Sequence, residues 1–415
     1  MSNAPLADLG RRAQVAARVL ATTTTGARDG ALLAAADLLV ASTAEILDAN
    51  AHDVERATRG GAPATIVDRL RLDAGRVEAM ATGLRQVAAL PDPVGEVVAG
   101  WTRPNGLRIT KVRVPLGVVG IIYENRPNVT SDAFGLCLKS GNAAFLRGSS
   151  GAITSNLAIA AILRQGLAKA GLPEDALLLV EDTSRESAVE FMRLRGLIDV
   201  LIPRGGRSLI DAILENATVP YVIDGDGNCH VYVDEHADLE MARDIVVNAK
   251  TQRPSVCNAA ESLVVHESVA ASFLPRVAEA LEGVVLVGDV ASQALAPTIA
   301  GATDADFDTE FLDLKMSVAV VADLDAAIDW VNEHGSGHTE AIVTRDLSAA
   351  ERFTREVDAA AVVVNASTRF VDGERFGFGA EIGISTQKLH ARGPMGLREL
   401  TTEKYVVRGD GHLVT

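Results

Sequence analysis

The sequence predicts an α/β fold in which two parallel β-sheets, each covered by helices, form separate domains. Short apolar runs alternate with helical stretches from Val114 to Val233, and a second alternating series begins near Cys229. Strand, helix and strand in this order give a parallel sheet with right-handed crossovers. A chain of 415 residues that is 48% hydrophobic is also large enough to bury more than one core.

An all-helical segment is expected first, from Leu6 to about Leu90. Its apolar residues recur at helical spacing, for example at Leu32, Leu33, Ala36, Leu39 and Val40. Residues 22–25 are four consecutive threonines, and Gly26 follows them. This run predicts a break between helices. Residues 101–114 then alternate in polarity, which predicts a strand or hairpin. Both of its faces are partly polar, which favours pairing with another subunit over covering a core.

The first alternating series contains apolar runs that read as strands buried on both faces. These runs are residues 117–122, 143–146, 177–180 and 200–202, with a helix expected over 155–170. The second series predicts strands at residues 262–265, 284–287, 316–321, 341–343 and 361–364.

The composition excludes several classes of partner. The chain has 39 Lys and Arg against 55 Asp and Glu, a formal net charge of −16, so we expect no binding to nucleic acid or to an anionic membrane. No apolar run reaches the roughly 18 residues of a membrane span, and no export signal is visible. Three cysteines, Cys137, Cys229 and Cys257, form no disulfide framework and lack metal-ligand spacing. A cytoplasmic enzyme without a metal is expected.

Cys257 is the leading candidate for a reactive group. It follows a proline-broken polar loop and has Arg253 four residues upstream, and nearby positive charge lowers a thiol's pKa. Burial as a small core residue is the equally open alternative.

The segment 202–210 predicts contact with a phosphate group. Gly205, Gly206 and Ser208 follow a buried strand and open a helix, where backbone amides and the helix N-terminus favour an anion. An ordinary strand-to-helix turn is the alternative, since no full G-x-G-x-x-G is present. His334 and His338 have glycines between them, so zinc geometry fails, and we expect hydrogen bonds to substrate or to neighbouring loops.

Five segments together resemble the aldehyde dehydrogenase superfamily and, within it, the gamma-glutamyl phosphate reductases (glutamate-5-semialdehyde dehydrogenases). These are residues 123–130, 136–142, 252–258, 334–340 and 390–405. The resemblance covers nearly the whole chain. It implies NADPH-dependent reduction of L-glutamate 5-phosphate to the semialdehyde with release of phosphate, the second step of proline synthesis from glutamate.

The resemblance also implies roles for single residues. Cys257 is at the position of the nucleophile, and Asn128 is the candidate for holding the oxyanion, with Asn125 left open. Glu310 matches the glutamate that contacts the nicotinamide-side ribose. Arg253 or another basic group is expected to assist the leaving phosphate.

Two local features favour reduction with NADPH. Aldehyde-oxidising relatives have a water-activating glutamate on the turn at residues 223–227, and this turn has none, which suits an acyl-phosphate reductase that must suppress water attack. Relatives that choose NAD often have a carboxylate three residues after the basic residue that ends the 143–147 strand. Here Arg147 is followed by Gly148, Ser149 and Ser150, which removes repulsion toward a 2′-phosphate.

The implied domains are a Rossmann-type cofactor domain (1–100 and 115–228, with 366–400 packing near it) and an α/β catalytic domain (229–365). Residues 101–114 and 401–415 are expected to form a small oligomerisation β-element, giving a homodimer or homotetramer. Association with glutamate 5-kinase is left open. Two other functions are also left open: oxidation of a small aldehyde to a free acid, and a catalytically silent nucleotide-binding scaffold.

Overall fold

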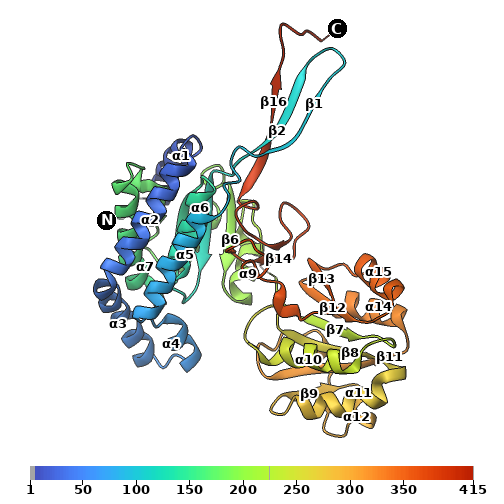
Figure 1. Cartoon of the computed structure of the whole chain (residues 1–415). Helices are drawn as coiled ribbons and strands as arrows, with labels where there is room; N and C mark the ends of the chain where they lie inside the picture. Colours follow the sequence, from blue (N-terminus) through green and yellow to red (C-terminus); the bar gives the residue numbers. More distant parts are fainter. Residues whose placement is uncertain (1–4, 224, 415) are drawn as a thin grey trace. The chain divides into compact units, whose positions relative to one another are not determined.

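The computed structural model describes residues 5–223 and 225–414 (Figure 1). They divide into two compact units. Unit one holds the described residues up to Ile223, Phe378–Gly383 and the chain from Met395 onward. Unit two holds the described residues from Gly225 to Gly377 together with Ile384–Pro394. The segment predicted to pack near the cofactor domain, residues 366–400, is thus shared, with 366–377 and 384–394 in unit two.

Unit one begins with the predicted helical segment, which is confirmed. Its helices are α1 (Leu6–Leu20), α2 (Thr25–Ala41), α3 (Thr43–Arg59), α4 (Ala64–Leu70) and α5 (Ala74–Ala89). The predicted break at residues 22–25 separates α1 from α2, and Thr24 caps α2 by accepting from the Ala27 N–H. The alanine-rich α2 packs closely on α7 (Ile153–Lys169), where a Cβ on Gly166 would lie 2.7 Å from the Ala35 Cβ.

The sheet of unit one has four parallel strands in the order β5-β4-β3-β6. They are β3 (Val118–Tyr123), β4 (Ala143–Gly148), β5 (Leu177–Leu179) and β6 (Val200–Arg204). The helices that follow them are α6 (Val129–Lys139), α7, α8 (Arg185–Met192) and α9 (Arg207–Asn216), with one-turn helices η1 (Ser150–Ala152) and η2 (Glu174–Ala176). β3 and β4 are buried along their whole length, as continuous apolar runs in a parallel sheet require.

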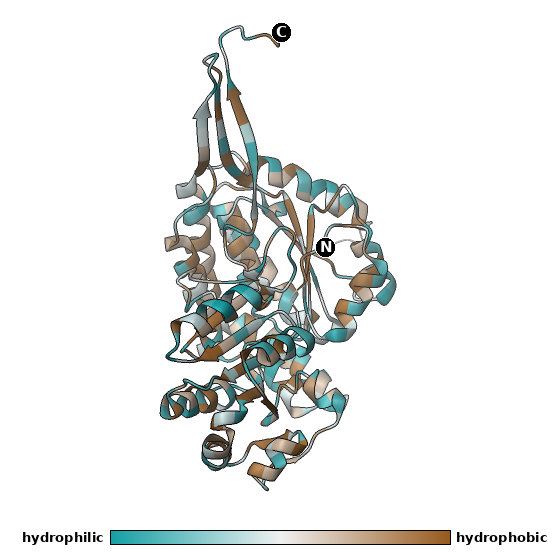
Figure 2. Cartoon of the chain, turned by 90° about the vertical axis from the view of Figure 1, so that its right-hand side faces the viewer, coloured by the Kyte–Doolittle hydropathy of each residue, from teal (hydrophilic) through white to brown (hydrophobic). Residues whose placement is uncertain are grey.

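A three-stranded antiparallel sheet extends from unit one (Figure 1). It contains β1 (Val97–Thr102), β2 (Arg108–Pro115) and β16 (Thr401–Arg408), in which β2 is central. The predicted hairpin is confirmed, and the C-terminal run pairs with it. Figure 2 shows hydrophobic residues on these strands, and Val97, Trp101, Tyr405 and Val407 are all exposed.

Unit two contains a seven-stranded parallel sheet in the order β10-β9-β11-β8-β7-β12-β13. The strands are β7 (Cys229–Val233), β8 (Ala260–His266), β9 (Val285–Gly288), β10 (Ala300–Gly301), β11 (Lys315–Val321), β12 (Thr339–Val343) and β13 (Ala361–Val364). The five strands predicted for this region are confirmed, while β7 and β10 were not among them.

Helices connect these strands and cover both sides of the sheet. They are α10 (Leu239–Thr251), α11 (Glu267–Ala280), α12 (Val290–Leu295), α13 (Asp304–Phe307), α14 (Leu324–His334), α15 (Leu347–Glu356) and the one-turn η3 (Thr368–Phe370). One core forms between the sheet and α10–α11 around Phe273, and a second forms against α14–α15 around Phe353. A short antiparallel pair, β14 (Ile384–Ser385) and β15 (Gly393–Pro394), completes the unit. The predicted α/β fold with parallel sheets is confirmed.

Among residues 5–223 and 225–414, no single helix is long and apolar enough to cross a bilayer. One bent pair of helices, Thr25–Ala41 with Thr43–Arg59, has the necessary length and composition only when the two are taken together.

Candidate active site

Cys257 lies in the loop between α10 and β8, at the amino end of β8. It is only partly buried, whereas Cys137 and Cys229 are buried, and burial raises the pKa of both buried thiols. The Cys229 thiol donates to the Cys257 carbonyl at 3.2 Å, and a Cβ on Gly227 would lie 1.7 Å from that carbonyl oxygen. Cys257 therefore combines partial exposure with a fixed backbone, as a nucleophile requires.

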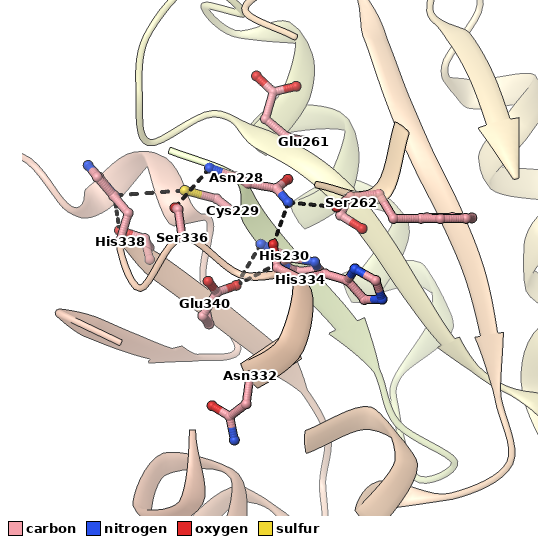
Figure 3. A network of polar contacts seen from close by, with 12 residues as sticks. Asn228, Cys229, His230, Glu261, Ser262, Asn332, His334, Ser336, His338 and Glu340 are labelled. Atoms are coloured by element: carbon pink, nitrogen blue, oxygen red, sulfur yellow. Dashed lines mark hydrogen bonds and ion pairs between the residues drawn. The ribbon is translucent and has the colours of Figure 1, made fainter. Parts of the chain in front are cut away.

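A buried glutamate, Glu340, holds the start of β7, just after Gly227. The His230 backbone N–H donates to Glu340 Oε2 at 2.7 Å, and His230 Nδ1 lies 3.0 Å from the same oxygen (Figure 3). Both side chains are fully buried. Burial raises the pKa of Glu340, and His230 opposes that shift. This pair joins β7 to β12.

The motif at residues 334–340 serves the same network (Figure 3). The His334 carbonyl accepts from the Asn228 amide at 2.8 Å, and Ser336 Oγ accepts from the Asn228 backbone N–H at 3.0 Å. His338 is fully buried, with Nδ1 3.8 Å from the Cys229 sulfur. The sequence predicted hydrogen bonds from this segment to substrate or to neighbouring loops, and the contacts described here are to neighbouring loops.

The Glu310 side chain forms a hydrogen bond with Gly227, the residue that packs against the Cys257 carbonyl. Its Oε1 accepts from the Gly227 N–H at 2.9 Å. The next turn has Leu312 at a φ of 54°, a left-handed conformation that needs support. That support is Glu261, whose Oε1 accepts from the Leu312 N–H at 3.1 Å while Oε2 lies 2.5 Å from Lys250 Nζ in a fully buried ion pair. Burial raises the pKa of Glu261 to about 7, with Lys250 opposing.

The predicted cofactor residues of unit one meet at one edge of its sheet. Strand register places Gly148, Tyr123 and Arg204 side by side at the carboxyl ends of β4, β3 and β6. Residues 149–150 and 205–208 follow directly. The carboxyl edge of an open parallel sheet is where nucleotides bind in this class of fold.

Arg147, near the end of β4, has its guanidinium held below this edge. Its Nη2 donates to the Thr183 carbonyl at 2.9 Å and to the Ser184 carbonyl at 2.7 Å. Burial lowers the pKa of Arg147, while the charges of Asp182 and Glu124 oppose the shift. Its buried Nε has no hydrogen-bond partner among the residues that the structure describes.

Arg56 is a basic residue at this edge that the sequence did not reveal. It extends from α3, and its Nη2 donates to the carbonyls of Ser150 at 2.9 Å and Gly151 at 3.2 Å. Asp53, fully buried, pairs with it. Half of the Arg56 side chain is exposed, so a second cation flanks the 149–150 turn.

Glu124 lies at the N-terminus of α9, where a phosphate was predicted. Its Oε2 is 3.4 Å from the Gly206 N–H, and a Cβ on Gly205 would lie 2.8 Å from the same oxygen. Gly205, Gly206 and Ser208 are themselves exposed. A helix N-terminus favours an anion, and in this structure the chain's own carboxylate lies there.

The two candidate asparagines for the oxyanion differ in their surroundings. Asn125 lies two residues after the end of β3 at a φ of 48°, and its Oδ1 accepts from Ser149 Oγ at 3.1 Å. Asn128 is exposed, and its Nδ2 donates to Asp132 at 2.9 Å. Both belong to unit one, whereas Arg253, Cys257 and Glu310 belong to unit two.

Comparison with known proteins identifies the family to which this chain belongs. A model of the aldehyde dehydrogenase family matches residues 5–306 and 316–406. The chain belongs to the aldehyde dehydrogenase family. It is 53% identical over 405 residues to gamma-glutamyl phosphate reductase from Thermoanaerobacter pseudethanolicus, which covers 97% of this chain and 98% of that protein.

Solved structures agree with this placement in the aldehyde dehydrogenase family. Gamma-glutamyl phosphate reductase from Thermotoga maritima matches with a TM-score of 0.97 at 48% identity over 99% of this chain and 100% of that one. An engineered glycolyl-CoA reductase with bound NADP⁺ shares the fold, with a TM-score of 0.65 at 18% identity over 97% and 96% of the two chains. The predicted aldehyde-dehydrogenase-like fold is confirmed, as is the resemblance to gamma-glutamyl phosphate reductases. The chain is an oxidoreductase of this family.

Members of the aldehyde dehydrogenase family use a nicotinamide cofactor, and the residues at the edge of the unit-one sheet fit one. Arg56 contacts the 149–150 turn, and Arg147 lies on the strand before it. The Ser149 and Ser150 hydroxyls and the exposed Gly205 and Gly206 follow the strands at the same edge. Within residues 5–223 and 225–414 no group of three or more His, Cys, Asp and Glu could hold a metal ion. Asp224, part of the 223–227 turn, lies outside the described residues.

Arg369 is a second basic residue that the sequence did not single out. It lies on η3 and is buried, with 8% of its surface exposed. Its Nε donates to the side chain of Gln252, at 2.9 Å, in the Cys257 loop. The one available signal was its place just before the glycine-dense segment at 376–384.

Proposed function

We propose that this chain reduces L-glutamate 5-phosphate to L-glutamate 5-semialdehyde with release of phosphate, as the second step of proline synthesis. The observation that carries the proposal is the 53% identity to a gamma-glutamyl phosphate reductase over 97% of the chain. The partly exposed Cys257 in a closely held loop supports it, because this chemistry needs a positioned nucleophile.

The proposed reaction begins at Cys257. Its thiolate attacks the acyl carbon, the C–S bond forms, and the C–O bond to phosphate breaks with its electron pair leaving on phosphate. The Cys257 backbone N–H and Asn128 hold the oxyanion, with Asn125 as the alternative donor, and Arg253 assists the leaving group. A nicotinamide cofactor, when bound, would supply the hydride that takes the thioester to the aldehyde oxidation level. Cys257 then departs as a thiolate.

NADPH is the proposed cofactor. Arg147, Ser149 and Ser150 would hold the adenosine-side ribose, Gly205, Gly206 and Ser208 would hold the pyrophosphate, and Glu310 would hold the nicotinamide-side ribose. No carboxylate occupies positions 148–150; Arg56 binds the Ser150 carbonyl, and Arg147 lies on the strand that precedes this turn. A 2′-phosphate therefore meets positive charge rather than repulsion.

The reverse reaction tests the proposal. Wild-type protein should reduce NADP⁺ with glutamate semialdehyde only when inorganic phosphate is present, because phosphate must release the acyl group from Cys257. Cys257→Ala should abolish this turnover while NADP⁺ binding, measured by fluorescence titration, survives. Equal turnover without phosphate would show aldehyde oxidation to a free acid instead, and normal turnover by Cys257→Ala would remove the mechanism.

Single alanine variants decide between the two asparagines. Asn128→Ala is expected to lower kcat by about 10²–10³, the usual effect of losing one oxyanion donor. The same loss in Asn125→Ala, with Asn128→Ala near wild type, would move the role to Asn125.

The β1-β2-β16 sheet is the proposed oligomerisation element of a cytoplasmic homodimer or homotetramer. The Trp101 and Tyr405 rings pack edge to face with their centroids 6.3 Å apart, yet both side chains remain exposed. Exposed apolar strands of this kind mark interfaces. Sedimentation of Trp101→Ser should show smaller species than wild type. Association with glutamate 5-kinase is tested by adding the kinase to the same experiment.

A further inference from the structure

Arg369, on η3, feels the charges of Cys257 and of two other arginines of unit two, Arg253 in the Cys257 loop and Arg375. Arg253 and Arg375 are exposed, and Arg369 is buried. Burial lowers the pKa of Arg369, the charges of Arg375 and Arg253 lower it further, and Asp372 and Cys257 oppose the shift. A desolvated guanidinium near two other cations is costly unless an anion joins them. This combination is typical of a site that binds an anionic ligand.

Hydrogen bonds fix η3 against the Cys257 loop in both directions. Thr368 Oγ1 donates to the Asn258 carbonyl at 2.7 Å, and Asn258 Nδ2 donates to the Val371 carbonyl at 2.8 Å. Thr368 and Val371 lie on either side of Arg369 in the chain, and Asn258 follows Cys257. The two hydrogen bonds therefore hold the η3 segment, which carries Arg369, against the Cys257 loop.

The orientation of Arg369 is also set. Its Nε donates to Gln252 Oε1 at 2.9 Å, and Gln252 immediately precedes Arg253. One side chain thus links the buried arginine to the exposed one. A planar guanidinium with a fixed edge suits bidentate binding of a phosphate or carboxylate, which a flexible ammonium does not match.

We propose that Arg369 and Arg253 form the site for the phosphate group of the acyl-phosphate substrate beside Cys257. This inference rests on the proposed function and adds the group that receives the leaving phosphate. As Cys257 Sγ bonds to the acyl carbon, the C–O bond breaks and the departing phosphate gains negative charge, which the two guanidinium groups stabilise. In reverse, they hold phosphate while its oxygen attacks the thioester carbon and the thiolate leaves.

Steady-state kinetics of the reverse reaction test this site. Arg369→Gln should raise the KM for phosphate about 10- to 100-fold, the effect of losing charge-assisted hydrogen bonds, with KM values for semialdehyde and NADP⁺ within about twofold. Arg369→Lys should recover only part of the loss, because it cannot bind in bidentate fashion. Arg276→Gln is the matched control, since this exposed α11 arginine pairs with Glu240 away from the loop.

A binding measurement supplies a readout that needs no turnover. Inorganic phosphate should slow alkylation of Cys257 by iodoacetamide in wild type and in Arg276→Gln, and should protect Arg369→Gln and Arg253→Gln much less. Arg253 is exposed, so its variant keeps the test available if Arg369→Gln fails to fold. Unchanged phosphate KM and protection in both variants would overturn the inference.

Two further outcomes separate the possible failures. A rise in the semialdehyde KM with an unchanged phosphate KM would assign Arg369 to the substrate's carboxylate and overturn the phosphate site. Wild-type turnover that ignores phosphate would refute the proposed function, whereas phosphate protection of Cys257 would still report whether the anion site exists.

Discussion

The two units carry their candidate residues on opposite edges of their parallel sheets. In unit one these residues follow the strands, at the carboxyl ends of β3, β4 and β6. In unit two Cys257, Glu310 and the 225–228 turn precede the strands, at the amino ends of β8, β11 and β7. The carboxyl edge is the usual position for a nucleotide, whereas our proposal puts the chemistry of unit two at the other edge, where buried contacts fix the loops.

The two edges also differ in rigidity. The unit-two loops contact one another through backbone atoms and buried side chains, such as Gly227 against Cys257 and Thr368 against Asn258. The unit-one turns are exposed, and the Glu124 carboxylate lies at the N-terminus of α9. We infer that changes beneath the unit-two loops affect kcat, whereas changes at the unit-one edge affect cofactor affinity.

The largest effect is expected from Gly227→Ala. The added Cβ would lie 1.7 Å from the Cys257 carbonyl oxygen and 2.8 Å from its Cα, so the nucleophile's backbone must move. A displacement of about 1 Å at a reacting group costs about 10²-fold in rate, and kcat should fall by at least about that factor. Gly30→Ala, on α2 with nothing within 4 Å of its Cβ, should keep wild-type kcat. A wild-type kcat for Gly227→Ala would show that the contact does not position Cys257.

Thr368→Val should have the next largest effect. It removes the 2.7 Å hydrogen bond to the Asn258 carbonyl while keeping the side chain's shape, and we expect kcat to fall about tenfold with a stability loss of about 1–3 kcal/mol. Thr344→Val is the control at the opposite edge of the same sheet, where Thr344 Oγ1 donates to Asp234 at 2.6 Å. If both variants lose stability and kcat alike, the edge occupied by Cys257 has no special role.

Arg56→Gln should act on cofactor choice rather than on kcat. The arginine flanks the 149–150 turn through the Ser150 and Gly151 carbonyls, so its loss should raise the KM for NADPH about tenfold, as for a charge-assisted contact. The KM for NADH should not change. Arg59→Gln, an exposed neighbour on α3 paired with Glu55, serves as control. Equal effects on NADH and NADPH would show that Arg56 does not meet the 2′-phosphate.

The smallest effect concerns pH and stability in unit one. Burial raises the pKa of Asp132 from its ordinary 3.8 to about 6, so the folded protein holds this proton more tightly than the unfolded chain. The stabilisation is complete below pH 4 and is lost as pH rises through 6. Asp132→Asn should therefore exceed wild type in free energy of unfolding by about 1–2 kcal/mol at pH 7 and match it near pH 4, in urea titrations. A constant difference across this range would contradict the assignment.

Local patterns predicted the elements that depend on local sequence. The helical spacing through Leu32–Val40 and the continuous apolar runs of β3, β4 and β11 gave their positions, because helix faces and buried strands impose periods on neighbouring residues. β7 was missed because its five residues, Cys229–Val233, contain His230, whose polarity is compensated only by Glu340 from another strand.

The sequence could nominate candidate site residues only where one segment carried the signal. Cys257, Arg253 and the 205–208 turn were recognisable from their own neighbours in the chain. Arg369 was not, because Thr368 beside it reaches Asn258 across 110 positions. The Glu124 carboxylate near Gly206 likewise joins residues 82 positions apart. Contacts of this kind arise from the fold and leave no local pattern.

Acylation of Cys257 is the central claim, and intact-protein mass spectrometry tests it directly. Protein mixed with glutamate semialdehyde and NADP⁺ in the absence of phosphate should gain the mass of one glutamyl group on the peptide that contains Cys257, and added phosphate should remove it. A protein that forms NADPH in phosphate buffer yet never shows that adduct, or shows it unchanged in Cys257→Ala, would contradict the account.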